Sequence, residues 1–282
     1  MRILRTIAEI RATVGDARQG GLTVGLVPTM GALHDGHLSL IRAARGADDL
    51  VVVSLFVNPA QFAPTEDLGS YPRTEEQDAR LAADAGADIL FAPPVDQIYP
   101  DGFATSIHVA GITDVMCGAH RGPGHFDGVA TVVTKLFQIV APDTAYFGQK
   151  DAQQVLVIRR LVRDLDIPVQ IVACPIVREP DGLAMSSRNA YLDPDARLRA
   201  TALNRALDAA EAVVARGETD AEAVLAAAGA PLADAGIEPE YLELRSPDDL
   251  RELDRVGDAA LLAVAAQVGA ARLIDNRILE AP

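Results

Sequence analysis

Short apolar runs alternate with amphipathic segments between residues 23 and 173. The apolar runs predict strands at 23–28, 50–57, 88–92, 144–147 and 169–173. The segments between them repeat apolar residues at helical spacing and predict helices at 37–45, 74–85, 128–140 and 152–164. Short apolar strands that alternate with helices are typical of a parallel sheet with helices on both faces.

The pattern changes after about residue 177, where a turn-rich crossing begins. Asp193 followed by Pro194 suits a helix N-cap with proline at the first helical position. Two alanine-rich helices are predicted from there, at 194–216 and 220–235. Three strands are predicted after them, at 240–244, 259–268 and 272–278.

These patterns predict an α/β fold with two domains. We expect a Rossmann-like parallel sheet with helices on both faces over residues 1–176. A smaller α+β domain over residues 177–282 is expected to close over it. With 282 residues, 49% of them hydrophobic, the chain can bury a sizeable core. Ligands of such sheets bind at the carboxyl ends of the strands, so polar residues just after strands are candidates for chemistry.

Composition and charge argue against several classes of protein. The formal charge of −15 argues against a nucleic-acid partner, because neutralising phosphates needs a basic surface. The apolar run 259–271 is too short for a membrane span, and Arg5 and Glu9 interrupt the N-terminal segment that a signal peptide would keep apolar. Cys117 and Cys174 stand far apart, which predicts buried free thiols. We therefore expect a cytoplasmic protein without a membrane or nucleic-acid partner.

The first strand leads into a distinctive turn. Gly31 and Gly36 allow close approach of a ligand to the backbone, and His34 and His37 stand three residues apart where a helix begins. A helix N-terminus presents unpaired N–H groups and a positive dipole, which suit a phosphate. The alternative is a capped core helix with incidental histidines.

Lysine is rare in this chain. Of the 25 lysine and arginine residues, only Lys135 and Lys150 are lysines. Lys135 lies in a predicted helix, where we interpret it as covering apolar surface. Lys150 follows a strand and a glycine at a helix start, which favours a phosphate clamp. A dinucleotide fingerprint and a Gly-x-x-x-x-Gly-Lys-Ser/Thr loop are both absent from the sequence.

Residues 185–189, Met-Ser-Ser-Arg-Asn, lie at the predicted domain junction. Two hydroxyls and an arginine bind phosphate oxygens well, and a mobile loop that carries them can close on ATP. The segment resembles the Lys-Met-Ser-Lys-Ser loop, and residues 34–37 resemble the His-x-Gly-His signature, of the nucleotidyltransferase superfamily that includes class I aminoacyl-tRNA synthetases. The first lysine of that loop is absent here, and arginine stands at the position of the second.

Further segments occur with these two in the order and spacing of the pantothenate synthetase family. The resemblance covers about residues 21–193, and its motifs lie at 28–37, 56–62, 71–73, 118–128, 148–154 and 185–189. It implies an ATP-dependent condensation of (R)-pantoate with β-alanine. A pantoyl adenylate forms first, with release of pyrophosphate and assistance from Mg²⁺, and β-alanine then displaces AMP. The resemblance also implies a homodimer.

The resemblance also implies roles for individual residues. Donors to the reacting phosphates are His34, His37, Lys150, Ser186, Ser187 and Arg188. ATP contacts are implied for Pro28, Thr29, Met30, Gly31, Ala32, Leu33, His34, Asp35, Gly36, His37, Gly148, Gln149, Lys150, Asp151, Val177, Met185, Ser186, Ser187 and Arg188. Contacts to pantoate or β-alanine are implied for Gln61, Gln154, Asn58, Phe62, Tyr71 and Arg121.

Some of these assignments leave alternatives open. Asp151 suits ribose hydroxyls but equally suits a cap on its own helix, and Gln61 is equally a candidate turn residue. Asp78 is a candidate carboxylate for Mg²⁺, which otherwise needs mainly phosphate oxygens and water. The remaining histidines lack metal-ligand spacing, so we interpret them as surface or supporting residues: His108, His120 and His125.

Two other functions remain open at this stage. One is a nucleotidyltransferase that releases the adenylylated compound as its product. The other is a non-catalytic module that senses nucleotides on the same fold. In each case the ligand is anionic, so cationic side chains of this acidic chain must converge on one cleft.

Overall fold

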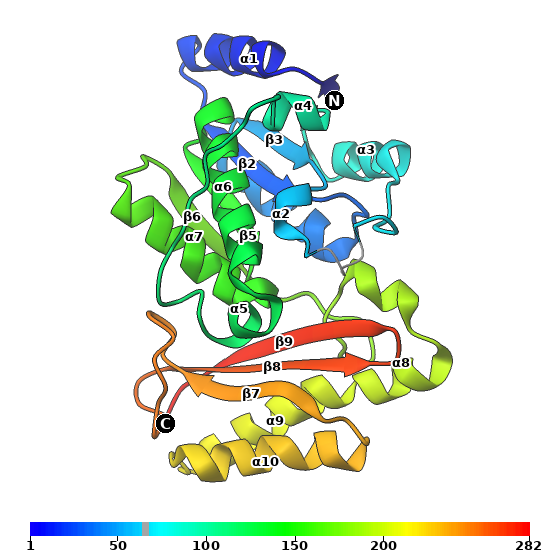
Figure 1. Cartoon of the computed structure of the whole chain (residues 1–282), viewed down its shortest axis with the longest axis vertical. Helices are drawn as coiled ribbons and strands as arrows, with labels where there is room; N and C mark the ends of the chain where they lie inside the picture. The colour runs from blue at the N-terminus through cyan, green and yellow to red at the C-terminus, as the bar shows by residue number, and fades with distance from the viewer. Residues whose placement is uncertain (64–67) are drawn as a thin grey trace.

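The computed structural model describes residues 1–63 and 68–282 and contains two sheets (Figure 1). The larger sheet is parallel and has the strand order β1-β4-β3-β2-β5-β6. In that order its strands are Arg2–Leu4, Ile89–Phe91, Leu50–Leu55, Val24–Thr29, Thr144–Gly148 and Gln170–Cys174. Chain order runs outward in opposite directions from β2 and β5, so the topological switch point lies between these two strands.

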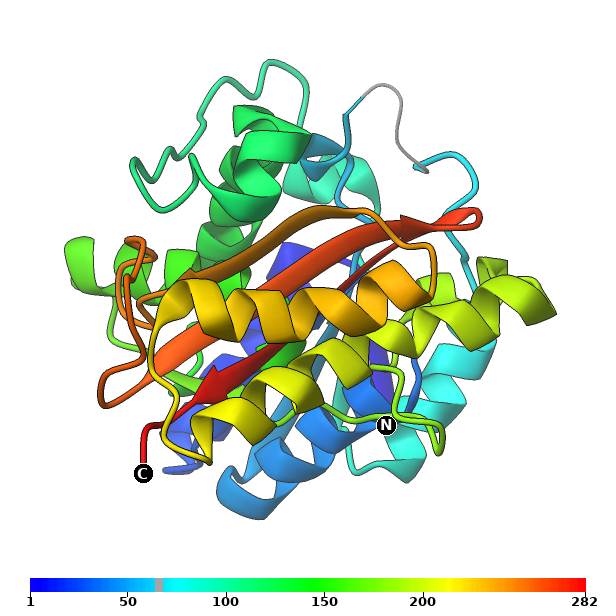
Figure 2. The same cartoon turned by 90° about the horizontal axis from the view of Figure 1, so that it is seen from below.

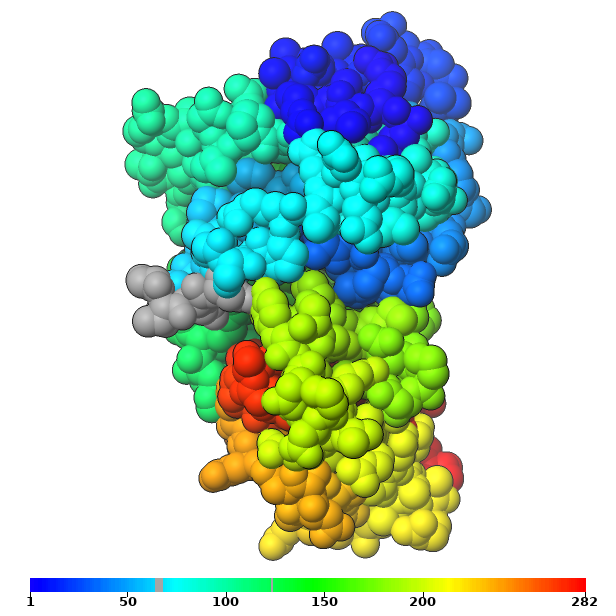
Figure 3. Space-filling view, turned by 90° about the vertical axis from the view of Figure 1, so that its right-hand side faces the viewer, coloured from blue at the N-terminus to red at the C-terminus, as the bar shows by residue number. Residues whose placement is uncertain are grey.

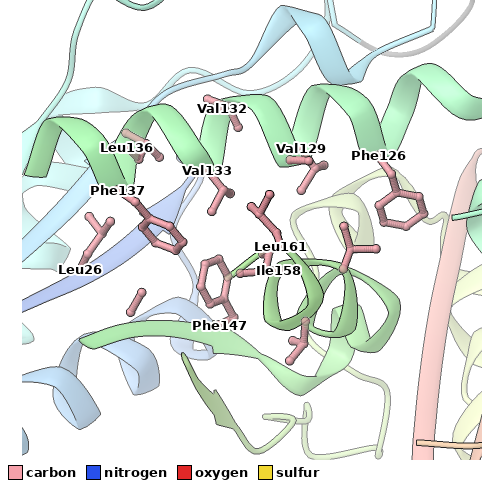
Figure 4. Packing of buried hydrophobic residues seen from close by; sticks show 14 of the residues in the cluster. Leu26, Phe126, Val129, Val132, Val133, Leu136, Phe137, Phe147, Ile158 and Leu161 are labelled. Carbon is pink, nitrogen blue, oxygen red and sulfur yellow. The ribbon is translucent and has the colours of Figure 1, made fainter. Parts of the chain in front are cut away.

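Helices cover both faces of the parallel sheet because its strands alternate apolar side chains between the faces. Val24 and Leu26 of β2 pack with helices on one face, and Val27 packs on the other. The first face carries α1 (Ile7–Gln19), α6 (Pro123–Val140) and α7 (Ala152–Asp164). The second face carries α2 (Asp35–Ala47) and α3 (Glu75–Asp84). Figure 4 shows the first layer, where Phe137 and Phe147 lie between α6, α7 and the sheet.

The smaller sheet is antiparallel and consists of β7 (Pro239–Arg245), β8 (Ala260–Val268) and β9 (Ala271–Leu279). Alternate residues of β8 are buried on opposite faces. Leu262 and Val264 pack against α9 (Ala202–Val214) and α10 (Ala221–Asp234), two helices that cover one face of this sheet (Figure 2). Leu261 and Ala263 belong to the same apolar cluster as α6 and α7. The smaller sheet is therefore covered on both faces.

Short elements complete the chain. Three helices occupy Val95–Ile98 (α4), Met116–Arg121 (α5) and Pro194–Ala200 (α8). The 3-10 turns are η1 (Pro59–Gln61), η2 (Gln149–Asp151) and η3 (Ser187–Tyr191). The yellow-green segment that includes η3 and α8 lies where the two sheet regions meet (Figure 3).

The predicted fold class is confirmed, and the predicted strands lie close to the observed ones. Both cysteines are buried free thiols, as predicted. The prediction of one helix over 194–216 is wrong, because the helix is interrupted at Thr201, whose hydroxyl donates to the carbonyl of Leu198. The domain boundary at residue 176 stays a prediction. In the part of the chain that the structure describes, no helix is both long and apolar enough to span a membrane.

Candidate active site

A cavity of about 230 Å³ opens at the carboxyl ends of β2 and β5, at the topological switch point. Most residues that the sequence implicates line this one cavity. Of the residues with an implied ATP contact, the lining includes Pro28, Thr29, Met30, His34, Gly36, His37, Gly148, Lys150, Asp151, Val177, Met185, Ser186, Ser187 and Arg188. Of the residues with an implied contact to pantoate or β-alanine, the lining includes Gln61, Gln154, Asn58, Phe62, Tyr71 and Arg121. Three cations of this acidic chain, Lys150, Arg121 and Arg188, therefore converge on the cavity.

The two histidines lie at the start of α2 with their ring centroids 4.1 Å apart. The backbone N–H of His34 donates to Nδ1 of His37 at 3.4 Å, so the neutral His37 ring carries its proton on Nε2. Burial, assisted by His34 and Lys150, lowers the pKa of His37 from 6.5 to about 3. Burial and the Lys150 charge also lower the pKa of His34. Both rings are therefore neutral donors near pH 7.

Asp78 of α3 holds the turn that precedes these histidines. The carboxylate is 1% exposed and accepts from the backbone N–H groups of Ala32 at 3.0 Å and Leu33 at 2.8 Å. The hydroxyl of Thr74 donates to it as well, at 3.2 Å. Gly31 has φ +87°, and an added Cβ would lie 3.1 Å from a carboxylate oxygen of Asp78. Asp78 therefore holds this turn and does not line the cavity, and its role toward Mg²⁺ stays a prediction.

The second strand-to-helix junction runs through η2. Lys150 lines the cavity, and its Nζ lies 3.6 Å from a carboxylate oxygen of Asp151. Asp151 precedes α7 but makes no side-chain cap hydrogen bond to that helix, so the capping alternative is wrong. The side chain of Gln149 donates to Oδ1 of Asn276 at 3.4 Å and does not line the cavity. The ATP contact implied for Gln149 stays a prediction.

Four other implicated residues lie outside the cavity lining: Gly31, Ala32, Leu33 and Asp35. They belong to the turn and the first helical residue, so they shape the site through the backbone.

The Ser186–Arg188 segment is held by local hydrogen bonds. The Ser186 hydroxyl accepts from the Arg188 N–H at 3.3 Å, and the Ser187 and Tyr71 hydroxyls lie 3.4 Å apart. The Arg188 guanidinium lies 6.0 Å from the centre of the Tyr71 ring. Two hydroxyls and one cation thus line the cavity beside the Phe62–Tyr71 pair of rings, whose centroids are 5.9 Å apart.

Asn58 is a supporting residue. It is 1% exposed, and its amide donates to Oε1 of Gln61 at 3.0 Å and to the carbonyl of Gly128 at 3.1 Å. Its own oxygen accepts from Tyr99 at 2.7 Å. These contacts use the amide, so Asn58 orients Gln61, and the contact to β-alanine implied for Asn58 stays a prediction. The Nε2 of Gln61 lies 3.3 Å from the sulfur of Met30, another residue of the cavity lining.

His125 was missed as a cavity residue by the sequence reasoning. Its Nδ1 pairs with the carbonyl of Gln61 at 2.9 Å, so this nitrogen carries the proton, and Nε2 accepts from Arg121 at 2.9 Å. Arg121 ends α5 and His125 lies in the first turn of α6, so no helical spacing in the sequence signalled this pair. His108 pairs with Asp127 elsewhere. An apolar wall from α6 was also missed, although its helical spacing was visible: Val129, Val132, Val133 and Leu136.

Metal-binding chemistry is limited in this cavity. Among the described residues 1–63 and 68–282, Asp151 is the one acidic residue that lines the cavity. The same part of the chain contains no group of three or more His, Cys, Asp and Glu residues placed to hold a metal ion. A divalent ion that enters with a nucleotide would find one protein carboxylate there.

Comparisons with known proteins agree with this geometry. Residues 2–278 match the model of the family described as Pantoate-beta-alanine ligase. The chain is 53% identical to the pantothenate synthetase of Moorella thermoacetica, covering 99% of each chain, and 52% identical to that of Koribacter versatilis, covering 100% of this chain and 97% of the relative.

Solved structures extend the comparison. The pantothenate synthetase of Thermus thermophilus superposes with a TM-score of 0.94 at 48% identity, covering 98% of this chain and 99% of that one. The pantoate-beta-alanine ligase of Francisella tularensis, complexed with beta-gamma ATP and beta-alanine, superposes with a TM-score of 0.79 at 35% identity, covering 99% of this chain and 97% of that one. The chain belongs to the pantoate-β-alanine ligase family.

Proposed function

We propose that this ligase joins (R)-pantoate to β-alanine in two steps, through an enzyme-bound pantoyl adenylate. The observation that carries the proposal is the meeting of two kinds of side chain in one cavity. Neutral and cationic groups that suit phosphates line this cavity, and so do the neutral amides of Gln61 and Gln154. This arrangement suits a nucleotide next to a small hydroxylated acid.

In the first step the pantoate carboxylate attacks the α-phosphorus of ATP and pyrophosphate leaves. Negative charge grows on the equatorial oxygens and on the leaving group. Preorganised donors lower the barrier most where this charge develops. His37 presents Nε2–H as a neutral donor, Lys150 supplies an ammonium, and Ser186–Arg188 supplies hydroxyls and a guanidinium.

The cavity also suits pantoate. Gln61 and Gln154 bind hydroxyls without repelling a carboxylate, because amides carry no net charge. The gem-dimethyl group packs against Phe62 and the apolar wall from α6. Asn58 donates to Oε1 of Gln61 and so fixes the orientation of the Gln61 amide. That orientation decides how Gln61 pairs with the hydroxyls of pantoate.

In the second step the amine of β-alanine attacks the acyl carbon and AMP leaves. Arg121 and Tyr71 line this part of the cavity. His125 accepts from Arg121 and so fixes the direction of its guanidinium, which supplies the charge opposite the β-alanine carboxylate.

Mg²⁺ fits this site as a companion of ATP. Asp151 offers one carboxylate, and phosphate oxygens and water supply the other ligands, in keeping with the preference of this ion. When bound, the ion neutralises charge on the triphosphate. The resemblance further supports a cytoplasmic homodimer, and sedimentation measurements test that assembly. It also supports a C-terminal region, from residue 177, that closes over ATP.

Exchange of labelled pyrophosphate into ATP tests the two-step reaction. We expect exchange with enzyme, Mg²⁺ and pantoate when β-alanine is omitted. A strict requirement for β-alanine would contradict the adenylate. Addition of β-alanine should then release AMP, whereas a nucleotidyltransferase would release the adenylylated acid and no AMP.

A further inference from the structure

Strand β9 carries two neighbouring polar residues that are almost completely buried and that the proposed steps do not use. Asp275 is 2% exposed and Asn276 is 3% exposed. β9 is the edge strand of the antiparallel sheet that lies nearest the parallel-sheet region (Figure 1). Burying such groups is unfavourable unless hydrogen bonds satisfy them, so their partners indicate what they hold.

Asn276 holds the turn that carries Lys150. Its amide donates to the carbonyl of Gln149 and to the carbonyl of Lys150, each at 2.9 Å. Its oxygen accepts from the side chain of Gln149. Two successive backbone carbonyls are therefore fixed by one side chain, and the position from which the Lys150 ammonium extends is fixed with them.

Asp275 holds the segment that leads to Ser186. Both of its oxygens accept from the guanidinium of Arg178, at 2.6 and 3.0 Å. Arg178 also donates to the carbonyl of Gly182 at 3.1 Å, and it forms a β-bridge with Ala184. The bidentate ion pair thus braces the base of the hairpin that leads into Ser186–Arg188.

We propose that Asp275 and Asn276 are positioning residues that set the Lys150 turn and the Ser186–Arg188 segment at a fixed separation. This inference rests on the proposed function, because both segments are phosphate-binding elements in it. Consecutive Cα atoms lie about 3.8 Å apart on a strand, so the two braces share one short rigid support. The C-terminal sheet thereby controls how two cationic elements meet one triphosphate.

The test compares three variants in the two half-reactions. Asn276→Ala removes both carbonyl contacts, and Asn276→Ser retains a hydroxyl donor on a shorter side chain that lies farther from both carbonyls. Arg277→Ala is the matched control, because Arg277 follows on the same strand but pairs with Asp208 and Glu211 of α9. Pyrophosphate exchange measures adenylate formation, and aminolysis of pre-formed pantoyl adenylate measures the second step.

We expect Asn276→Ala to slow exchange about 10- to 100-fold through kcat, since a displacement of about 1 Å has that scale of effect. Asn276→Ser should lie between this variant and the wild type. Aminolysis should change much less, and Arg277→Ala should keep both rates while lowering the thermal midpoint.

Two outcomes would overturn the inference. One is exchange at the wild-type rate in folded Asn276→Ala or Asn276→Ser. The other is an equal loss in both half-reactions that follows the folded fraction measured by circular dichroism. A wild-type enzyme without pantoate-dependent exchange would instead contradict the proposed function itself.

Discussion

The two strand-to-helix junctions of the cavity present different donors to a phosphate, and different parts of the molecule hold their turns. At the junction of β2 with α2, His34 and His37 are neutral donors, and Asp78 of the neighbouring α3 holds the turn. At the junction of β5 with α7, Lys150 is a cation, and Asn276 of the distant antiparallel sheet holds the turn. The first junction is stabilised within the parallel-sheet region, and the second is stabilised from outside it.

The two junctions differ in the charge of their donors and in the region that positions them. Neutral donors at a helix start stabilise a phosphate through directed hydrogen bonds, and the helix dipole adds to that stabilisation. A cation adds a larger attraction to the triphosphate, and its benefit depends on where its backbone is held. Asn276 of β9 therefore holds the turn of the charged junction, whereas Asp78 of α3 holds the turn of the neutral one. The following predictions test this division, beginning with the largest effect.

Removing the donor at either junction tests whether both act on the same developing charge. We expect His37→Ala and Lys150→Ala each to slow adenylate formation about 100- to 1000-fold, the effect of losing one preorganised donor. Lys150→Arg should remain impaired, because a planar fork replaces a compact ammonium. Rapid-quench measurements on single turnovers give these rates.

Aminolysis of pre-formed pantoyl adenylate is the internal control for both variants. It should change much less, because pyrophosphate has already left when β-alanine attacks. Equal losses in the two half-reactions would mean that His37 and Lys150 position the adenylate in both steps. Neither residue would then act specifically on the charge that develops as pyrophosphate leaves.

Asp78→Asn tests the support of the first junction. An amide accepts with one oxygen and turns its NH₂ group toward a backbone N–H of Ala32 or Leu33, which leaves a buried donor unsatisfied. We expect the free energy of unfolding to fall by about 1–3 kcal/mol. Denaturant titration followed by circular dichroism measures it, since the chain has no tryptophan.

The matched control is Asp84→Asn, which makes the same charge change at an exposed position of α3. It should leave the stability within about 0.5 kcal/mol of the wild type. If Asp78→Asn matched it, the carboxylate would not hold the turn, and a role toward Mg²⁺ would again need testing.

The sequence predicted elements best where apolar periodicity was strong. α7 was predicted at its observed bounds, and it buries apolar residues along one face from Val155 to Leu161. α1 was missed because only Ile10 and Val14 are buried, so its pattern is mostly polar. α6 begins at Pro123, before the predicted start, because glycines and a proline at its N-terminus have the composition of a loop.

The site was predictable in its residues and less so in their connections. Motifs identified most of the cavity lining, because polar residues after parallel strands share one edge of the sheet. The supporting contacts join residues far apart in sequence. Asn276 lies 126 positions from Lys150, and Gln61 lies 64 positions from His125. Such pairs depend on the packing of whole elements, and local patterns do not specify them.

The pH dependence of folding gives the smallest expected effect and tests the neutral state of the first junction. Burial lowers the folded-state pKa of His37 to about 3, whereas the unfolded chain titrates near 6.5. Between these values the unfolded state binds more protons, so stability falls as the pH drops below 6.5 and levels off below 3. For this one residue the loss between pH 7 and about 5.5 is about 1 kcal/mol. Denaturant titrations at both pH values should show this drop in the free energy of unfolding in the wild type. In His37→Gln the drop should be smaller by the contribution of His37. Equal pH dependence in the two proteins would mean that folded His37 binds its proton as readily as the unfolded chain, and the two junctions would then both be cationic in weak acid.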